Sequence, residues 1–490
     1  MHHEYVQLSS GLNSDQKGIH DIVLKSIDLS LGKLFFVSGS GGTGKTYLWR
    51  TLLAKVRSEG KIAITVATSG IAALLLPGGR TAHLRFKIPL NPTEEATCDI
   101  KKGTQLAELI MQTSLIIWDE APMTNKYCFE AVDKSLRDIM KSVREEFSAK
   151  PFGGITTVLG GDFRQILPVI PKGDRQDIIQ ACIKTSYLWQ VCEVHSLQQN
   201  MRLKADNLDS ASKEQMRHFA NWILDIGNGK HCPDSGEAWV TIDPDLMIEN
   251  TDSGVRSIIE NIYQDLEDHV GESNFLVPRA ILTPTNETVD LINDHILERI
   301  PAEESIYFSS DSICKADFHV EEQDLLYPTE FLNTLKFPGF PPHTLRLKKG
   351  AAIMLLRNLN QGSGLCNGTR LKITQLEKWF IEGEILTGSS VGEKVLIPRI
   401  TLSPSESKWP FVLKRRQYPI SLCFAMTINK SQGQSLQHVG LYLPKQVFTH
   451  GQLYVAVSRV TTRNGLRILT TDEDQPTDNT ILNIVYKEIL

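Results

Sequence analysis

The segment Gly39–Thr46, with the sequence GSGGTGKT, constrains the fold of this chain more than any other stretch. It follows the apolar run Leu34–Val37 and precedes residues with helical spacing, so it predicts a strand, a loop and a helix in succession. In the pattern G-x-x-x-x-G-K-[ST], glycines let backbone N–H groups surround phosphates, the lysine reaches the β- and γ-phosphates, and the hydroxyl binds Mg²⁺. The predicted nucleotide-binding residues of this loop are Gly39, Ser40, Gly41, Gly42, Thr43, Gly44, Lys45 and Thr46, and Thr46 is also a predicted Mg²⁺ ligand.

Three more apolar runs in the first part of the chain end in polar residues. These runs, with the polar residues that follow them, are Ile62–Ala67 with Thr68, Leu115–Trp118 with Asp119 and Glu120, and Thr156–Leu159 with a loop ending in Gln165. Repeated strand, polar loop and helix predict an α/β fold with a parallel sheet covered by helices on both faces. All the polar loops then lie at the same edge of the sheet as the phosphate loop.

The acidic pair that follows Leu115–Trp118 has a defined use beside a phosphate loop. Asp119 can hold Mg²⁺, and Glu120 can accept a proton from the attacking water. A solvated pair of acids in a loop is the alternative, but the four strand-forming residues before the pair argue against it. Gln165, at the same predicted edge, is placed to sense the γ-phosphate.

The second part of the chain predicts another sheet without a phosphate loop. Its expected strands are Arg279–Ile281, which is followed by the loop Leu282–Asn286, then Val439–Leu443 and Leu466–Thr470. Short apolar runs separated by Gly and Pro lie between them and predict a small β-barrel inserted into the second sheet domain.

Composition excludes several classes of protein and leaves the partner open. The chain has 490 residues, 41% of them apolar and 22% charged, with a formal charge of -5, which is ordinary for a globular enzyme of two to four domains. This net negative charge argues against a histone-like protein that coats nucleic acid through its overall positive charge. A local basic groove on the surface remains compatible with it. The eight cysteines show no metal-binding spacing and are expected to be thiols of a reducing compartment. No apolar run is long enough to span a membrane and no targeting segment is visible, so we expect no export.

Four further positions carry weaker signals. Gln16 lies at the start of a predicted helix capped by Asn13 or Ser14, and its amide has the donor and acceptor needed to read an adenine edge. An exposed glutamine at a helix start is the ordinary alternative. His83 is more often a plain surface residue than a ligand contact. Near the end, Phe424–Ser435 is rich in groups that contact phosphate and sugar, and Arg459 ends a segment with helical spacing.

With these motifs in this order, the sequence resembles superfamily 1B DNA helicases of the petite-integration-frequency (Pif) family, which are related to RecD. The resemblance extends from Leu12 to Arg459. The motifs that carry it are the amide at Gln16, GSGGTGKT, DEAPM at Asp119–Met123, GGDFRQ at Gly160–Gln165, QNMR at Gln199–Arg202, GLCNGTRL at Gly364–Leu371, TINKSQGQS at Thr427–Ser435 and YVAVSR at Tyr454–Arg459.

The resemblance implies two RecA-like parallel-sheet domains in tandem with small inserted domains, including an SH3-like β-barrel in the second. It places the first motor domain at 1–200 with a wedge-type insertion at about 80–105, the second at 201–300 and 420–490, and the β-rich insert at 301–419. It also implies an ATP-driven motor that moves 5′ to 3′ on single-stranded DNA and unwinds duplex and forked DNA, with ATP and Mg²⁺ as cofactors.

The resemblance also assigns roles to individual residues. Gln16 would contact adenine, Gly433 would contact the nucleotide, and Arg202 and Arg459 would reach the phosphates from the second domain. Lys45, Glu120 and Gln165 complete the implied catalytic set. The implied DNA-binding residues are Thr68, His83, Thr285, Asn286, Thr427, Lys430 and Ser431.

Two details resemble helicases of Helitron rolling-circle transposons and their eukaryotic derivatives. Ala121-Pro122 stands where cellular members tend to have Ile-Ser, and Asn429 stands where they tend to have His. A Helitron transposase also needs a nuclease with a His-x-His pair, which the thirteen histidines here do not form. We therefore expect a helicase portion or a stand-alone relative, a monomer that cooperates with or is fused to such a nuclease, and a nuclear location.

Two other functions stay open from the sequence. One is an RNA-directed motor, because phosphate contacts read the backbone and only contacts to the 2′-OH separate RNA from DNA. The other is a nucleotide-gated scaffold that binds nucleic acid without unwinding it, against which the presence of Lys45, Glu120, Arg202 and Arg459 argues.

Overall fold

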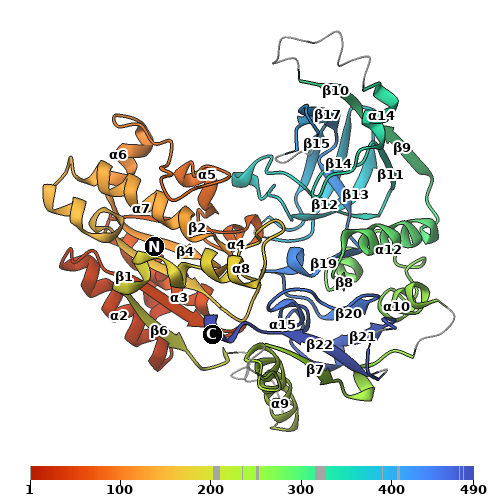
Figure 1. Ribbon diagram of the computed structural model, residues 1–490, viewed down its shortest axis with the longest axis horizontal. Coiled ribbons are helices and arrows are strands. Elements are labelled where there is room, and N and C mark those ends of the chain that lie inside the picture. Colours follow the sequence, from red (N-terminus) through yellow and green to blue (C-terminus); the bar gives the residue numbers. More distant parts are fainter. Residues whose placement is uncertain are drawn as a thin grey trace. The chain divides into compact units, whose positions relative to one another are not determined.

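The computed structural model describes residues 2–201, 210–233, 236–249, 253–314, 327–388, 390–404, 409–473, 475–477 and 479–490. Contacts divide the chain into two compact units (Figure 1). The first unit comprises Met1–Ile242, Gln446–Arg463 and Asp474–Leu490, and the second comprises Asp243–Lys445 and Asn464–Glu473. Each unit is described by itself.

The first unit is built on a six-stranded sheet in the order β3-β2-β4-β5-β1-β6, in which every neighbouring pair is parallel. Its strands are β1 Leu34–Gly39, β2 Ile62–Ala67, β3 Arg80–Thr81, β4 Thr113–Asp119, β5 Thr156–Gly161 and β6 Cys192–Leu197. The four predicted strands are confirmed, and the polar residues that follow them share one edge of the sheet as expected.

Helices cover this sheet, and their apolar faces close its core. The helices of this part are α1 His2–Ser10, α2 Ser14–Asp28, α3 Lys45–Ser58, α4 Gly70–Leu74, α5 Ala82–Phe86, α6 Gln105–Met111, α7 Lys126–Met140 and α8 Arg175–Ala181. Phe35 and Val37 of β1 are fully buried against Trp49 and Leu52 of α3, so the strand and helix on either side of the phosphate loop pack rigidly together.

From the sequence, the apolar residues Ile71–Leu76 and the segment from Lys126 to about Phe147 each predict a helix, and both helices end earlier than predicted. The helix expected over Ile71–Leu76 ends at Leu74, just before Pro77-Gly78-Gly79. The helix expected to reach Phe147 ends at Met140, because the chain turns back along α7 and the backbone N–H of Phe152 donates to the Asp133 carboxylate at 2.6 Å.

The first unit also contains later parts of the chain. They form α9 Ser210–Gly227, β7 Glu237–Thr241, α15 Gln452–Val457 and β22 Thr480–Ile484. β22 pairs antiparallel with β7, and α15 packs on α9. These contacts group 201–242 and 446–463 with the phosphate loop rather than with the second sheet, whereas the boundaries of the motor domains stay a prediction.

The second unit contains a four-stranded parallel sheet in the order β19-β8-β20-β21. Its strands are β8 Arg279–Thr283, β19 Ala425–Thr427, β20 His438–Leu443 and β21 Leu466–Thr470, and the helices of this unit are α10 Gly254–Ile262, α11 Ser273–Leu276, α12 Asn286–Arg299 and α14 Thr329–Thr334. The three predicted strands are confirmed, and the three-residue β19 is an addition.

The β-rich part of the second unit is antiparallel. Five strands follow the order β15-β14-β13-β12-β18, three more the order β10-β17-β16, and β9 pairs with β11. Their bounds are β9 Glu304–Phe308, β10 Ser310–Ile313, β11 Thr344–Lys348, β12 Ala352–Leu355, β13 Arg370–Leu376, β14 Phe380–Ile385, β15 Lys394–Pro398, β16 Ile400–Leu402, β17 Leu413–Gln417 and β18 Ile420–Leu422. Because β15 and β18 are the two ends of an open order, the described residues form no closed barrel, and this part of the predicted fold is corrected.

No helix within the described ranges is both long enough and apolar enough to cross a membrane.

Candidate active site

The phosphate loop connects the carboxyl end of β1 to the first turn of α3. Gly44 has φ +81°, and a Cβ there would lie 2.4 Å from Nε2 of Gln16, so both backbone conformation and space require glycine. Lys45 Nζ donates to the carbonyls of Gly39 and Ser40. The Lys45 ammonium is therefore held within the loop, next to the N–H groups that face a bound anion.

Gln16 is fully buried and braces this loop. Its Nε2 donates to the carbonyls of Thr43 and Gly44, both at 3.3 Å, and its Oε1 accepts from the backbone N–H of Asn13 at 3.0 Å. The Asn13 side chain in turn accepts from the backbone N–H of Gln16, which completes a capping box at the start of α2. Gln16 thus positions the phosphate loop, and its contact with adenine stays a prediction.

Asp119 ends β4 with only 7% of its surface exposed. Burial raises the pKa of its carboxyl, and the nearby Lys45 charge opposes that shift. Among the described residues, Asp119 Oδ1 is buried without a hydrogen-bond partner. A buried, unsatisfied carboxylate oxygen at the end of β4 and the hydroxyl of the loop residue Thr46 are oxygen donors of the kind that Mg²⁺ prefers, so the chemistry of these residues fits the expected cation.

Glu120 has an unusual backbone and a shifted acidity. Its φ is +53°, a left-handed conformation that costs free energy in a residue with a side chain. Burial and then the neighbouring Asp119 raise the pKa of its carboxyl to about 7, while Lys45 and Arg459 act in the opposite direction. A carboxylate with a pKa near neutrality is suited to act as a general base.

Thr68, a predicted DNA contact, is tied to this base. Its hydroxyl donates to the carbonyl of Glu120 at 2.7 Å and also contacts the hydroxyl of Thr124 at 2.7 Å. The backbone N–H of Thr68 donates to the carbonyl of Asp119 at 3.2 Å. Thr68 therefore holds the strained strand end in place.

Of the three remaining predicted catalytic residues, the structure describes Gln165 and Arg459. Gln165 is buried, and Arg459 is buried to 7% exposure with its Nε donating to the carbonyl of Val455 at 2.9 Å. Arg459 lies in the same unit as Glu120, and its charge acts on the Glu120 carboxyl. Arg202 lies outside the described residues.

His83 lies near the start of α5 and is partly buried, and this burial lowers the pKa of its imidazole. Its Nε2 lies 3.8 Å from the sulfur of Cys128. Neither observation tests its predicted contact with DNA.

The second unit brings several other predicted DNA contacts to one sheet edge. Thr285 caps α12 just after β8, Asn286 begins that helix, and Thr427 ends β19, which pairs in parallel with β8. Lys430 follows in a short 3-10 helix, Ile428–Ser431, where burial lowers the pKa of its ammonium. The buried Ser431 hydroxyl donates to the carbonyl of Ile428 at 2.7 Å.

Gly433, the nucleotide contact implied by the resemblance, has φ +77° and belongs to the second unit. Its contact with nucleotide stays a prediction.

Several residues of the first unit that support the site were not predicted. The backbone N–H of Met201 donates to the carbonyl of Gly42 at 2.9 Å, which ties the QNMR motif to the phosphate loop. A Cβ on Gly160 would lie 2.4 Å from the Trp49 ring and 3.2 Å from Asp119 Oδ1, so this glycine makes room for the Trp49 ring and the Asp119 carboxylate. Asp162 and Tyr454 form a buried hydrogen bond of 2.6 Å. In the sequence, only their position inside the motifs could have pointed to these residues.

A cavity of about 180 Å³ adjoins the phosphate loop. Ser40 and Gly41 line one part of it, Gln198 and Asn200 another, and residues of α9 and α15, Tyr454 among them, the rest. The cavity thus joins three of the sequence motifs to one space next to the expected phosphates.

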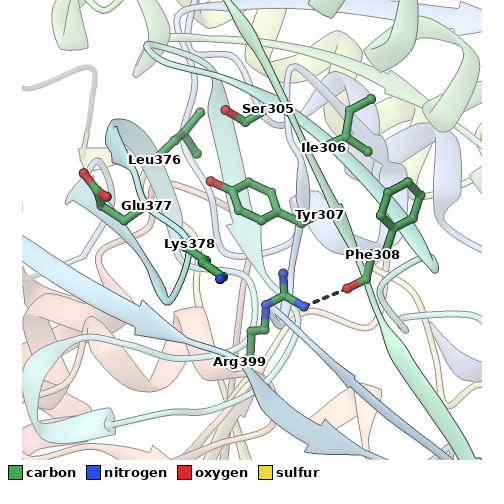
Figure 2. Close-up of a pocket in the computed structure, with 8 residues that line it drawn as sticks. All are labelled: Ser305, Ile306, Tyr307, Phe308, Leu376, Glu377, Lys378 and Arg399. Atoms are coloured by element: carbon green, nitrogen blue, oxygen red, sulfur yellow. Dashed lines mark hydrogen bonds between the residues drawn. The ribbon is translucent and has the colours of Figure 1, made fainter.

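A larger hollow of about 570 Å³ belongs to the β-rich part of the second unit (Figure 2). It is lined by Ser305–Phe308, Leu376–Lys378 and Arg399, and the Arg399 guanidinium donates to the carbonyl of Phe308 at 2.7 Å. None of the predicted site residues lines it.

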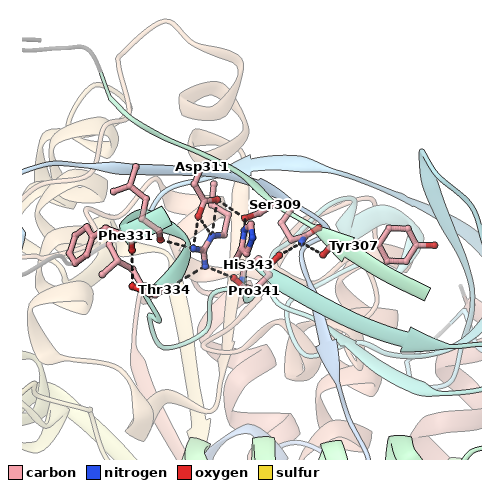
Figure 3. Close-up of polar contacts among 11 residues, drawn as sticks. Tyr307, Ser309, Asp311, Phe331, Thr334, Pro341 and His343 are labelled. Atoms are coloured by element: carbon pink, nitrogen blue, oxygen red, sulfur yellow. Dashed lines mark hydrogen bonds and ion pairs between the residues drawn. The ribbon is translucent and has the colours of Figure 1, made fainter. Parts of the chain in front are cut away.

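A buried ion pair lies in the same part of the second unit (Figure 3). Arg415 binds both carboxylate oxygens of Asp311 at 2.6–3.0 Å and also donates to three backbone carbonyls at 3.1–3.2 Å. Both side chains are 1% exposed or less. These bonds fasten α14 and the loop after it to the sheet of β10, β17 and β16.

The fold and the site together define a P-loop nucleoside triphosphatase: a parallel sheet carries the phosphate loop, the candidate metal ligand Asp119 and the candidate base at one edge. Comparison with known proteins narrows this class. A family model described as PIF1-like helicase matches residues 11–236, and one described as DNA helicase Pif1, 2B domain, matches residues 330–376. The chain belongs to the PIF1-like helicase family.

The relatives in this comparison are distant but cover most of the chain. The human ATP-dependent DNA helicase PIF1 is 27% identical over 467 residues, which are 94% of this chain and 61% of the human protein. The ATP-dependent DNA helicase Pif1 of Bdellovibrio bacteriovorus is 25% identical over 95% of this chain and 92% of its own length. The chain therefore spans about three fifths of the length of the human relative, compared with nearly all of the bacterial one.

Solved structures show the same fold. Bacteroides Pif1 bound to single-stranded DNA superposes with a TM-score of 0.64 at 23% identity, over 91% of both chains. Bacteroides Pif1 in complex with ADP-AlF3 and single-stranded DNA gives 0.65 at 22% identity, over 96% of this chain and 94% of that one.

Proposed function

We propose that this chain is an ATP-dependent DNA helicase that uses Mg²⁺, moves 5′ to 3′ along single-stranded DNA and unwinds duplex DNA. The observation that carries the proposal is the pair of the buried Asp119 and the partly exposed Glu120 beside Lys45, in a unit that also contributes Arg459. A base with a pKa near 7, a metal ligand and two cations at one site are the groups that hydrolysis of a nucleoside triphosphate requires.

The residues divide the hydrolytic step between them. Lys45 moves from the loop carbonyls to the β- and γ-phosphates. Asp119 and Thr46 would hold Mg²⁺, which would neutralise phosphate charge. Glu120 accepts a proton from the water that attacks the γ-phosphorus, while the bond from that phosphorus to the bridging oxygen breaks and ADP leaves with that oxygen. Arg459 stabilises the charge of the transferring group.

Three findings support DNA as the partner. The curated relatives are named DNA helicases, and solved relatives are described as bound to single-stranded DNA and to forked duplex DNA. The predicted backbone contacts Thr285, Thr427 and Lys430 share the edge formed by the carboxyl ends of β8 and β19. Hydroxyl and ammonium donors at such an edge suit a phosphate backbone.

The direct test compares the stimulation of ATP hydrolysis by single-stranded DNA and by single-stranded RNA of equal length and sequence. We expect DNA to raise the turnover rate much more than RNA does, with Glu120→Gln as the inactive control. Equal stimulation would identify an RNA-tolerant motor. Binding of either strand without turnover would identify a nucleotide-gated scaffold.

The finer parts of the proposal rest on the family resemblance. They are the 5′ to 3′ direction, action as a monomer, cooperation with a separate rolling-circle nuclease and a nuclear location.

A further inference from the structure

Two segments of the first unit that carry different parts of the proposed chemistry are joined by buried polar contacts. One is the sensor loop, Asp162–Gln165, which ends in the predicted γ-phosphate sensor. The other is the arginine segment, His450–Arg459, which includes α15 and ends in the predicted arginine finger. The Tyr454 hydroxyl donates to Asp162 Oδ2 at 2.6 Å, and both side chains are 2% exposed or less.

His450 adds a second link with a defined proton position. The backbone N–H of Tyr486 donates to Nδ1 of His450 at 2.8 Å, so Nδ1 is the acceptor and Nε2 carries the proton. That proton is donated to the carbonyl of Phe163 at 2.8 Å. Burial lowers the pKa of the imidazole to about 4, so His450 is neutral at physiological pH and keeps this arrangement.

The backbones of the two segments also touch. Gly451 has φ +74°, and a Cβ there would lie 2.3 Å from the carbonyl oxygen of Arg164 and 2.8 Å from the carbonyl carbon of Gln165. A Cβ on Gly227, the last residue of α9, would lie 2.6 Å from the Tyr454 ring. Glycine at both positions is therefore what permits the close approach.

Asp162 sets the shape of the sensor loop. Its Oδ1 accepts from the backbone N–H of Arg164 at 3.2 Å and from the Arg164 guanidinium at 3.0 Å, and its carbonyl accepts from the backbone N–H of Gln165 at 3.1 Å. Its other carboxylate oxygen is the one that Tyr454 binds. A movement of Gln165 is therefore passed to Asp162, and from Asp162 to Tyr454.

The far end of the link reaches the arginine. Arg459 follows Tyr454 by little more than one helical turn, and its Nε donates to the carbonyl of Val455, the residue after Tyr454. Tyr454 and Ser458 line the cavity of about 180 Å³ that also borders Ser40 and Gly41 of the phosphate loop. The arginine segment thus borders the space next to the phosphate loop.

From these contacts we propose that Tyr454, through Asp162, is a positioning residue that couples the γ-phosphate sensor Gln165 to the arginine finger Arg459. The inference rests on the proposed ATPase function and adds to it a route between two catalytic groups. When the sensor loop closes on the γ-phosphate, the buried hydrogen bonds move the arginine segment with it. Loss of the Tyr454 hydroxyl leaves Gln165 and Arg459 in place, but the movement of one is no longer passed to the other.

The test uses the full chain with ATP, Mg²⁺ and single-stranded DNA. Tyr454→Phe removes only the hydroxyl, and we expect kcat to fall about tenfold or more while KM for ATP stays within about threefold, because the lost bond acts on the transition state. Tyr442→Phe is the matched control: this buried tyrosine of the second unit contacts Thr471 at 3.4 Å, takes no part in the site, and should leave kcat unchanged.

A double-variant cycle separates positioning from simple support of the fold. Arg459→Lys keeps a cation but loses the planar guanidinium, so a reduced turnover remains measurable. If Tyr454 acts through Arg459, adding Tyr454→Phe to Arg459→Lys should lower kcat by less than about twofold further. Losses that multiply in the double variant, or a kcat for Tyr454→Phe close to that of the parent, would overturn the proposal.

A measurement on the parent protein covers the case in which Tyr454→Phe does not fold. ADP with aluminium fluoride should slow amide hydrogen exchange in both 162–165 and 452–459, whereas ADP alone should not slow it in 452–459. Slower exchange confined to 162–165 contradicts the coupling. A parent protein that hydrolyses no ATP contradicts the proposed function itself, which is a separate outcome.

Discussion

Glu120 shows how far the sequence predicts a single residue of the site. Its place after a buried strand and beside Asp119 predicts a base next to a metal ligand, and the structure puts both acids at the end of β4. The φ of +53° and the bond from the Thr68 hydroxyl to its carbonyl were not predictable, because they depend on the packing of β2 beside β4. The sequence therefore predicts which acids stand at the end of the strand, but it does not predict the backbone strain at Glu120 or the hydrogen bond that supports it.

Gln16 shows the same limit in another way. The sequence predicts a helix start and an amide near the nucleotide, and the capping box confirms the helix start. The two bonds from its amide nitrogen to carbonyls of the phosphate loop join parts of the chain 27 and 28 residues apart. Only the folded chain brings those groups together.

Lys45→Ala and Glu120→Gln should fail in different ways. Removing Lys45 takes away the ammonium that faces the phosphates and should weaken ATP binding, whereas Glu120→Gln keeps the shape of the site and removes the base. We expect Glu120→Gln to bind ATP within a few-fold of the parent while its turnover falls by about 10²-fold or more. Equilibrium binding of a fluorescent ATP analogue, together with steady-state turnover, checks both expectations. An equal loss of nucleotide affinity in the two variants would contradict these assignments.

At the scale of elements, the long apolar runs were predictable and the short or terminal pieces were not. The predicted bounds Ile62–Ala67 and Leu466–Thr470 coincide with β2 and β21, because buried parallel strands are continuous apolar runs. β3 has two residues and β19 three, which is too short for a periodic signal. The structure contains the strands of the predicted barrel, but the barrel is not closed. Closure requires hydrogen bonds between the two edge strands of the sheet, and such long-range pairing is not visible in the local sequence.

The Arg415–Asp311 pair tests the account of the β-rich part (Figure 3). Arg415→Met should destabilise the second unit by roughly 3–5 kcal/mol, because it leaves the Asp311 carboxylate buried without its partner. Arg346→Met is the matched control: the Arg346–Glu304 pair is 38% and 25% exposed, and its loss should cost at most about 1 kcal/mol. Thermal unfolding followed by circular dichroism measures both changes. Equal, small effects in the two variants would show that the buried pair does not hold this part together.

At the scale of the whole molecule, the order of motifs predicts the family, and the family comparisons confirm it. The two units defined by contacts do not follow the order of the motifs. The sequence places 420–490 with the second sheet, whereas contacts of β22 with β7 and of α15 with α9 group parts of that range with the phosphate loop. Motif order along a chain does not determine which unit a motif packs against, since strands can pair across several hundred residues.

Unwinding of a partial duplex tests the central claim most directly. Two substrates carry the same duplex and a single-stranded tail at either the 5′ or the 3′ end, and strand separation is followed by fluorescence with ATP and Mg²⁺, with Glu120→Gln as the control. An ATP-driven motor that moves 5′ to 3′ should separate the strands only from the 5′ tail, and the control should separate neither substrate. If the parent chain hydrolyses ATP and binds both tails but separates neither duplex, or separates only the 3′-tailed one, the proposed function is wrong.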